Sequence, residues 1–137
     1  MEEYKTEIKE KNKFKNKNFF TSSKYALRGL KEIFLSERNI RIQISIAIIA
    51  IILSIFLKIT KIEFMLIFVS IFFVIFSEII NTIVEKILDI YTKNYNEEVK
   101  KIKDMSAGVV IFSVFLSLVF GIIIFVPKIF ALILKLF

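Results

Sequence analysis

Carboxylate and amide side chains recur at helical spacing in the segment Glu78–Asp89, which reads EIINTIVEKILD. At about 100° per residue, Glu85 lies roughly 20° from Glu78, and Asn81 lies roughly 60° to one side. The remaining positions are mostly apolar, and Glu78 has apolar residues on both sides. Burying a carboxylate in hydrocarbon costs free energy, so we take Glu78 as a candidate functional residue.

Further charged groups stand just before the neighbouring apolar blocks. Glu37 precedes one block by a few residues, and Lys103-Asp104 precede another. Carboxylates hold Mg²⁺ together with substrate phosphates, and a lysine neutralises phosphate charge. A partly desolvated carboxylate can take a proton from a hydroxyl, so the set suits phosphoryl transfer. The predicted site comprises Glu37, Glu78, Asn81, Glu85, Asp89, Lys103 and Asp104.

Each feature also has a purely structural explanation when it is taken alone. Glu37 forms an i,i+4 pair with Arg41, which can serve the end of a helix. Asn81 can form a hydrogen bond to a neighbouring helix. The Lys103-Asp104 pair suits a solvated helix start, and the acidic residues after Glu78 suit a solvated continuation. The i, i+3, i+7, i+11 spacing on one side favours a site over these alternatives.

Three apolar blocks must position these groups. The chain has 137 residues, of which 56% are hydrophobic, and this exceeds the apolar share of an ordinary soluble domain. About 20 apolar residues cross a bilayer, so we expect transmembrane helices at about 40–57, 62–88 and 105–126. The chain contains no His and no Cys, which excludes histidine-based catalysis, thiolate zinc sites and disulfides.

The residues before the first block are basic. Residues 1–18 read as a disordered basic tail, and residues 19–35 as an amphipathic helix lying in the membrane interface. Lys and Arg number 11 up to the first span, then 2, 5 and 2 in the following segments. This alternation predicts a cytoplasmic N-terminus and a cytoplasmic site. The net charge of +7 indicates an anionic partner, such as lipid headgroups, a nucleotide or nucleic acid.

The residues alone leave three function classes open. The first is a kinase that phosphorylates a membrane alcohol. The second is a small proton-coupled transporter with Glu78 as its proton-binding carboxylate, a class that has no use for Glu37 or Lys103. The third is a pore-forming or accessory membrane protein, which would show no Mg²⁺ dependence.

The segment Glu78–Asp89 resembles the signature of the prokaryotic diacylglycerol kinase and undecaprenol kinase family, whose pattern is E-x-x-N-[ST]-x-[IV]-E-x-x-x-D. Further matches are KYALRGL at 24–30, SERNIR at 36–41 and KDMSAGVV at 103–110. The resemblance covers the chain from about residue 19 to Pro127, which is nearly all of it except the tail.

The resemblance implies a single membrane kinase domain over 19–137, all-α, with one interfacial helix and three spans in a homotrimeric bundle. It also implies a bacterial multi-pass protein of the cytoplasmic membrane that transfers phosphate from ATP to a lipid alcohol, with no nucleic-acid partner. Glu78 is then the general base, and Asn81 supports it. By the same resemblance, Glu37 and Glu85 hold Mg²⁺, and the nucleotide-binding residues are Tyr25, Glu37, Glu85, Asp89, Lys103 and Asp104.

The acceptor branch also follows from the resemblance. The SERNIR and KDMSAG forms are similar to the undecaprenol kinase branch, so undecaprenol is the expected acceptor and diacylglycerol the alternative. Three positions depart from the usual pattern. Gln43 stands where that branch usually has His, Ile83 replaces a small residue, and Ser106 stands where Ala is common.

Overall fold

The computed structural model describes residues 19–135, and this part of the chain contains helices and no strand. The helices are α2 (Phe19–Ser36), α3 (Arg38–Phe56), α4 (Lys61–Tyr91) and α5 (Glu97–Leu134). The chain divides into two compact units, one ending at Ser36 and the other beginning at Glu37. The kinase domain predicted over 19–137 is therefore described in two parts. The basic tail predicted over 1–18 lies outside the described residues.

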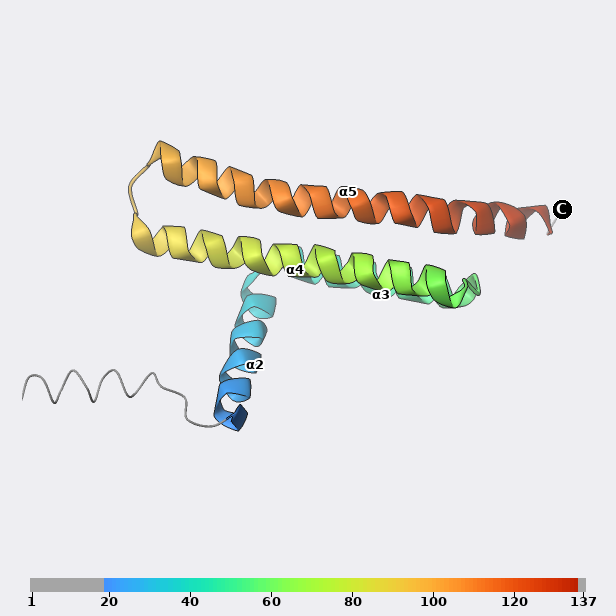
Figure 1. Ribbon diagram of the computed structural model, residues 1–137, viewed down its shortest axis with the longest axis horizontal. Helices are drawn as coiled ribbons and strands as arrows, with labels where there is room; N and C mark the ends of the chain where they lie inside the picture. Colours follow the sequence, from blue (N-terminus) through green and yellow to red (C-terminus); the bar gives the residue numbers. More distant parts are fainter. Residues whose placement is uncertain (1–18, 136–137) are drawn as a thin grey trace, which may run out of the picture. The chain divides into compact units, whose positions relative to one another are not determined.

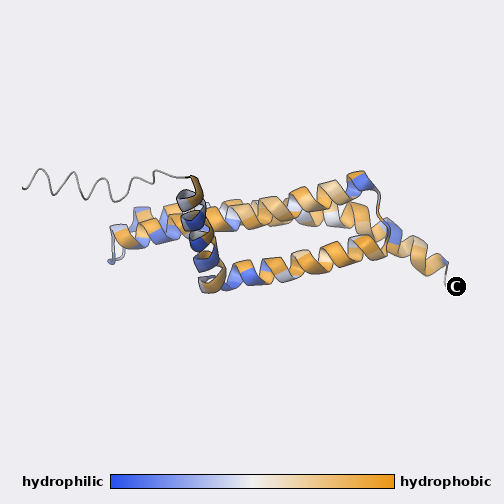
Figure 2. Ribbon diagram, turned by 90° about the horizontal axis from the view of Figure 1, so that it is seen from below, coloured by the Kyte–Doolittle hydropathy of each residue, from blue (hydrophilic) through white to orange (hydrophobic). Residues whose placement is uncertain are grey.

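The second unit contains three helices that are long and apolar enough to cross a membrane, α3, α4 and α5. The chain is thus an all-α membrane protein, as predicted. At about 1.5 Å per residue, α4 and α5 are both longer than the roughly 30 Å of bilayer hydrocarbon. Hydrophobic residues cover most of the length of these helices, and hydrophilic residues gather at the α4–α5 turn (Figure 2).

The three spans lie side by side, and α5 runs antiparallel to α4 (Figure 1). Polar contacts mark the register of this pair along its whole length. At one end the Lys128 ammonium lies 3.0 Å from the Glu63 carboxylate. Near the middle the Ser77 and Ser113 hydroxyls are 2.7 Å apart. These contacts fix which turn of α5 faces which turn of α4.

The helix starts follow capping chemistry. Thr60 caps α4, and it forms a capping box in which the Glu63 carboxylate accepts a hydrogen bond from the Thr60 backbone N–H. Asn96 caps α5 by accepting from the backbone N–H groups of Glu98 and Val99. This cap starts α5 at Glu97, before the apolar block that was predicted to begin at residue 105.

Pro127 lies inside α5, which continues to Leu134. The helix therefore extends beyond residue 126, the predicted end of the last span. A proline removes only one backbone donor, and a helix in an apolar environment has no water to replace its other hydrogen bonds. Continuing the helix beyond the proline satisfies more backbone groups than ending it there.

The interior of the bundle is more polar than its outside. Large apolar side chains such as Phe68 and Phe72 are more than half exposed, as expected of a surface that contacts lipid or another chain. Such polar interiors suit helices that associate in lipid, where small and polar residues supply the specific contacts. Among residues 19–135, the buried positions are Ile40, Ala47, Ile67 and Ile124, and also Ser54, Ser70, Ser77, Glu78, Asn81 and Thr82.

The described part of the first unit is α2, which has no buried residue. Its Arg28 guanidinium lies 5.9 Å from the centre of the Tyr25 ring, a cation–π arrangement. Apolar residues such as Phe19 and Leu27 are exposed. Its location in the membrane interface stays a prediction.

The Glu63–Lys128 ion pair gives a test of the α4–α5 register. Glu63→Gln keeps a residue suited to the capping box but removes the charge, and Lys128→Met removes the cation. A double-mutant cycle should give a coupling of about 0.5–1 kcal/mol, because the pair is partly exposed. The measurement is unfolding of the detergent-solubilised protein. Lys135→Met is the control, and zero coupling between Glu63 and Lys128 would contradict this register.

Candidate active site

α4 carries its polar residues from the interior of the bundle to its solvent end. Glu78 is 4% exposed and Asn81 is 9% exposed, whereas Glu85 is half-buried. The Asp89 side chain, near the end of the helix, is 66% exposed. The spacing predicted from the sequence therefore produces a graded series, in which a buried carboxylate is followed by increasingly accessible polar groups.

The innermost group, Glu78, is held by the neighbouring helix. The amide Nε2 of Gln43, on α3, donates to Glu78 Oε2 at 3.0 Å. The Gln43 carbonyl Oε1 is buried and accepts no hydrogen bond from the described residues. A buried carboxylate is thus paired with a neutral amide, and the carbonyl oxygen of that amide lies enclosed in protein beside it.

The next group outward is a hydrogen-bonded chain between α4 and α5. The Ser106 hydroxyl, on α5, donates to Asn81 Oδ1 at 2.6 Å, and it also lies 2.9 Å from the Lys103 carbonyl oxygen. The Asn81 amide in turn donates to Glu85 Oε1 at 3.1 Å. Asn81 therefore fixes one oxygen of the Glu85 carboxylate.

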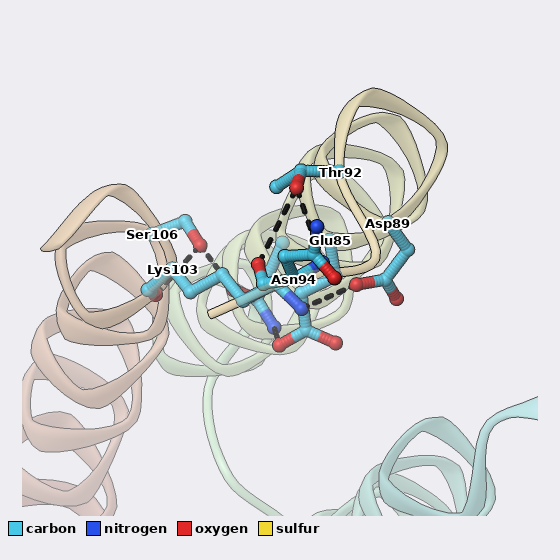
Figure 3. Close-up of polar contacts among 7 residues, drawn as sticks. Glu85, Asp89, Thr92, Asn94, Lys103 and Ser106 are labelled. Carbon is cyan, nitrogen blue, oxygen red and sulfur yellow. Dashed lines mark hydrogen bonds and ion pairs between the residues drawn. The ribbon is translucent and has the colours of Figure 1, made fainter. Parts of the chain in front are cut away.

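The outermost group is an ion pair across the α4–α5 turn. Lys103 Nζ lies 2.5 Å from Asp89 Oδ1, as the dashed line in Figure 3 shows. The Lys103 side chain is 35% exposed, so a soluble ligand can reach part of it. In the turn itself, the Thr92 hydroxyl donates a hydrogen bond to the Asn94 carbonyl oxygen and accepts one from the Asn94 backbone N–H (Figure 3). Asp104 follows Lys103 and is exposed.

The other predicted residues lie elsewhere in the chain. Glu37 is the N-cap residue of α3 and is half-buried, so it begins the helix that carries Gln43. Tyr25 belongs to α2, in the other unit, and is 53% exposed. The structure therefore joins Glu78, Asn81, Glu85, Asp89 and Lys103 through α4 and its hydrogen bonds, and it describes Tyr25 separately.

Two site residues were not predicted as such. Gln43 and Ser106 stood out in the sequence only as departures from a family pattern, yet they contact the two innermost predicted residues, Glu78 and Asn81. The signal was available for Gln43, because it is a large polar residue inside an otherwise apolar span. The third departure, Ile83, is 41% exposed.

The carboxylates can be tested against the needs of a divalent cation. Among residues 19–135, no group of three or more Asp, Glu, His or Cys side chains converges to hold a metal ion by itself. Mg²⁺ does not need such a cage, since it usually takes one or two carboxylates, several waters and substrate phosphates. Glu85, with one oxygen fixed by Asn81, fits this requirement.

Comparison with known proteins gives one family. The model of the family described as "Prokaryotic diacylglycerol kinase" matches residues 24–125. The matched range contains every residue of the predicted site, and it covers about three quarters of the chain. No curated protein matches the chain significantly.

The Gln43–Glu78 hydrogen bond predicts a specific stability effect. Gln43→Met keeps a side chain of similar length but removes the donor, which leaves a buried carboxylate unpaired. We expect a loss of about 2 kcal/mol in unfolding free energy, because hydrogen bonds to charged groups contribute about 1.5–3 kcal/mol. In a Glu78→Leu background the same substitution should cost less than half as much. Equal losses in the two backgrounds would show that Gln43 acts through packing alone.

Proposed function

Because the chain belongs to the prokaryotic diacylglycerol kinase family and is therefore a lipid kinase, we propose that it transfers the γ-phosphate of ATP to undecaprenol. The observation that carries this proposal is Glu78, a carboxylate that is 4% exposed and hydrogen-bonded to Gln43 inside a membrane bundle. Buried carboxylates in apolar helices are expensive to maintain, and a proton-accepting role explains why one is present.

The proposed reaction assigns the proton and the phosphoryl group as follows. Glu78 takes the proton of the lipid hydroxyl while the alcohol oxygen bonds to the γ-phosphorus of ATP. The bond from that phosphorus to the oxygen bridging it to the β-phosphorus breaks, and ADP leaves. Asn81 supports the site by fixing Glu85 through the 3.1 Å hydrogen bond. Most of the acceleration in such a transfer comes from positioning and charge neutralisation.

Mg²⁺ and ATP are assigned to the accessible end of the polar series. Glu85 and Glu37 would hold Mg²⁺, which neutralises charge on the phosphates when it is bound. Lys103 would bind phosphate by exchanging its partner Asp89 for the nucleotide, since its side chain is already partly exposed. Tyr25, Asp89 and Asp104 complete the proposed nucleotide-binding residues.

The acceptor is assigned from the family resemblance of the motifs. The forms SERNIR and KDMSAG are similar to the undecaprenol kinase branch, and diacylglycerol is the alternative acceptor within the same reaction class. Both lipids present a hydroxyl at the membrane interface above hydrocarbon. An acceptor of this kind suits a base that lies inside the bundle but near its polar end.

The setting of the enzyme is also part of the proposal. The distribution of Lys and Arg, 11, 2, 5 and 2 along the chain, supports a cytoplasmic N-terminus and active site in a bacterial cell membrane. The excess positive charge suits anionic headgroups. A homotrimer follows from the family resemblance. The extensive exposed apolar surface of α3, α4 and α5 could form the contacts between its subunits.

Glu78→Gln tests the proposed base. The substitution keeps the size of the side chain and a hydrogen-bonding partner for Gln43 but removes the proton acceptor. We expect transfer from labelled ATP to undecaprenol in nanodiscs to fall by about 10³-fold, the order of a general-base contribution. ATP binding should be unchanged. Near-normal turnover in this variant would show that Glu78 is not the base.

Glu85→Gln tests the proposed Mg²⁺ ligand. The variant loses one carboxylate at the metal but keeps an amide oxygen, so activity should need at least tenfold more Mg²⁺ or disappear. Glu97→Gln, at the exposed start of α5, is the matched control. A Mg²⁺ titration of Glu85→Gln that overlays the wild-type curve would remove Glu85 from the metal site.

A further inference from the structure

An apolar cavity of about 410 Å³ lies between α3, α4 and α5. Its volume falls in the range of about 300–1,000 Å³ typical of sites that enclose small molecules. The lining includes Ala47 and Ala50 from α3, Ile67 and Ile75 from α4, and Gly121 from α5. Small residues at three of these positions leave the space open.

The cavity begins at the partner of the proposed base. Gln43 lines the cavity and also donates to Glu78 at 3.0 Å. Val74, one helical turn before Glu78, lines it as well. The cavity therefore extends from the immediate neighbourhood of Glu78 along α4 toward Ile67, away from the polar α4–α5 turn. Between Ile75 and Ile67 alone the helix rises about 12 Å.

The polar groups of the cavity are few and unevenly placed. Gln43 and Ser117 are the only polar side chains among the described residues that line it, and no charged side chain does. The Gln43 carbonyl Oε1 is buried and unpaired within residues 19–135. Because Oε1 is enclosed by protein atoms, an occupant can pair with it only when the Gln43 amide turns toward the cavity. An occupant that then satisfies these walls has a hydrogen-bond donor at the Gln43 end and hydrocarbon beyond it.

We propose that this cavity binds the hydrocarbon chain of the acceptor lipid next to its hydroxyl, and that Gln43 positions that hydroxyl at Glu78. The inference rests on the proposed function, and it adds the place where the acceptor chain lies. The hydroxyl donates to Gln43 Oε1 on binding, while the same amide holds the Glu78 carboxylate beside it. Only the segment nearest the hydroxyl is enclosed, and the rest of a long polyprenyl chain continues into the bilayer.

Filling the cavity should affect the lipid and spare the nucleotide. An added Cβ at Gly121 would meet only the Phe125 ring, at 3.9 Å, so the backbone accepts a side chain there. Gly121→Leu and Ala50→Phe place bulk in the cavity from α5 and α3. The matched controls Ile123→Phe and Ile49→Phe add bulk to the same helices at positions that are 62% and 64% exposed.

The first arm of the experiment is kinetic, with full-length protein in nanodiscs. Both cavity variants should raise the KM for undecaprenol at least tenfold and leave the KM for ATP within twofold. Both controls should stay within twofold of wild type for both substrates. A KM for undecaprenol that is unchanged in the folded cavity variants would overturn the proposal.

The second arm does not depend on turnover or on the stability of a variant. A polyprenol that carries a photoreactive diazirine on the isoprene unit nearest the hydroxyl is cross-linked to wild-type protein, and the labelled residues are identified by mass spectrometry. Labelling of cavity residues such as Ala47, Ile71 or Leu118 supports the proposal. Labelling confined to exposed outer faces overturns it. If wild type phosphorylates no undecaprenol, the proposed function fails, and this arm still decides whether the cavity binds the chain.

Discussion

A carboxylate inside a bundle of apolar helices must have a hydrogen-bonding partner, and the arrangement of this protein follows from that requirement. Glu78 is 4% exposed, and its partner Gln43 comes from a different helix. The hydrogen bond therefore requires α3 to pack against α4 with one register. An unpaired charge in this position would destabilise the bundle, so the residue proposed as the general base also constrains the fold.

The same logic extends outward along α4. Asn81 and Glu85 are joined to each other, and Ser106 ties them to α5. Asp89 ends the series in an exposed ion pair with Lys103. The series connects an apolar interior, where a lipid can lie, to a surface that soluble ATP can reach. A lipid kinase has to bring these two substrates together. A single long helix that runs from the apolar interior to the solvent-exposed end can position groups for both.

Much of this was predictable from the sequence because the underlying signals are periodic. The three apolar blocks gave three spans, and the i, i+3, i+7, i+11 spacing placed Glu78 and Asn81 inside the bundle. Boundaries were harder to predict. The charged residues at the start of α5 lie outside its apolar pattern, so only the Asn96 cap marks where the helix begins. A proline ends a helix more readily in water than in hydrocarbon, and α5 continues past Pro127.

The partners of the site residues were not predictable, because a sequence does not show which turns of separate helices face one another. Gln43 is visible in the sequence as a polar residue in an apolar span, but the contacts that Gln43 and Ser106 make depend on the α3–α4 and α4–α5 registers. The cavity has the same origin, since Ala50 and Gly121 are far apart in the chain and line one cavity only after the helices pack. The local period of one helix is encoded in adjacent residues, whereas contacts between helices depend on the whole bundle.

The most direct test of the account is a competition between the two acceptors. Purified protein in nanodiscs that contain equal amounts of undecaprenol and diacylglycerol is given labelled ATP and Mg²⁺, and the two lipid phosphates are separated and counted. The account predicts that most of the label appears in undecaprenyl phosphate. Label that appears mainly in phosphatidic acid, or in neither lipid, would contradict it.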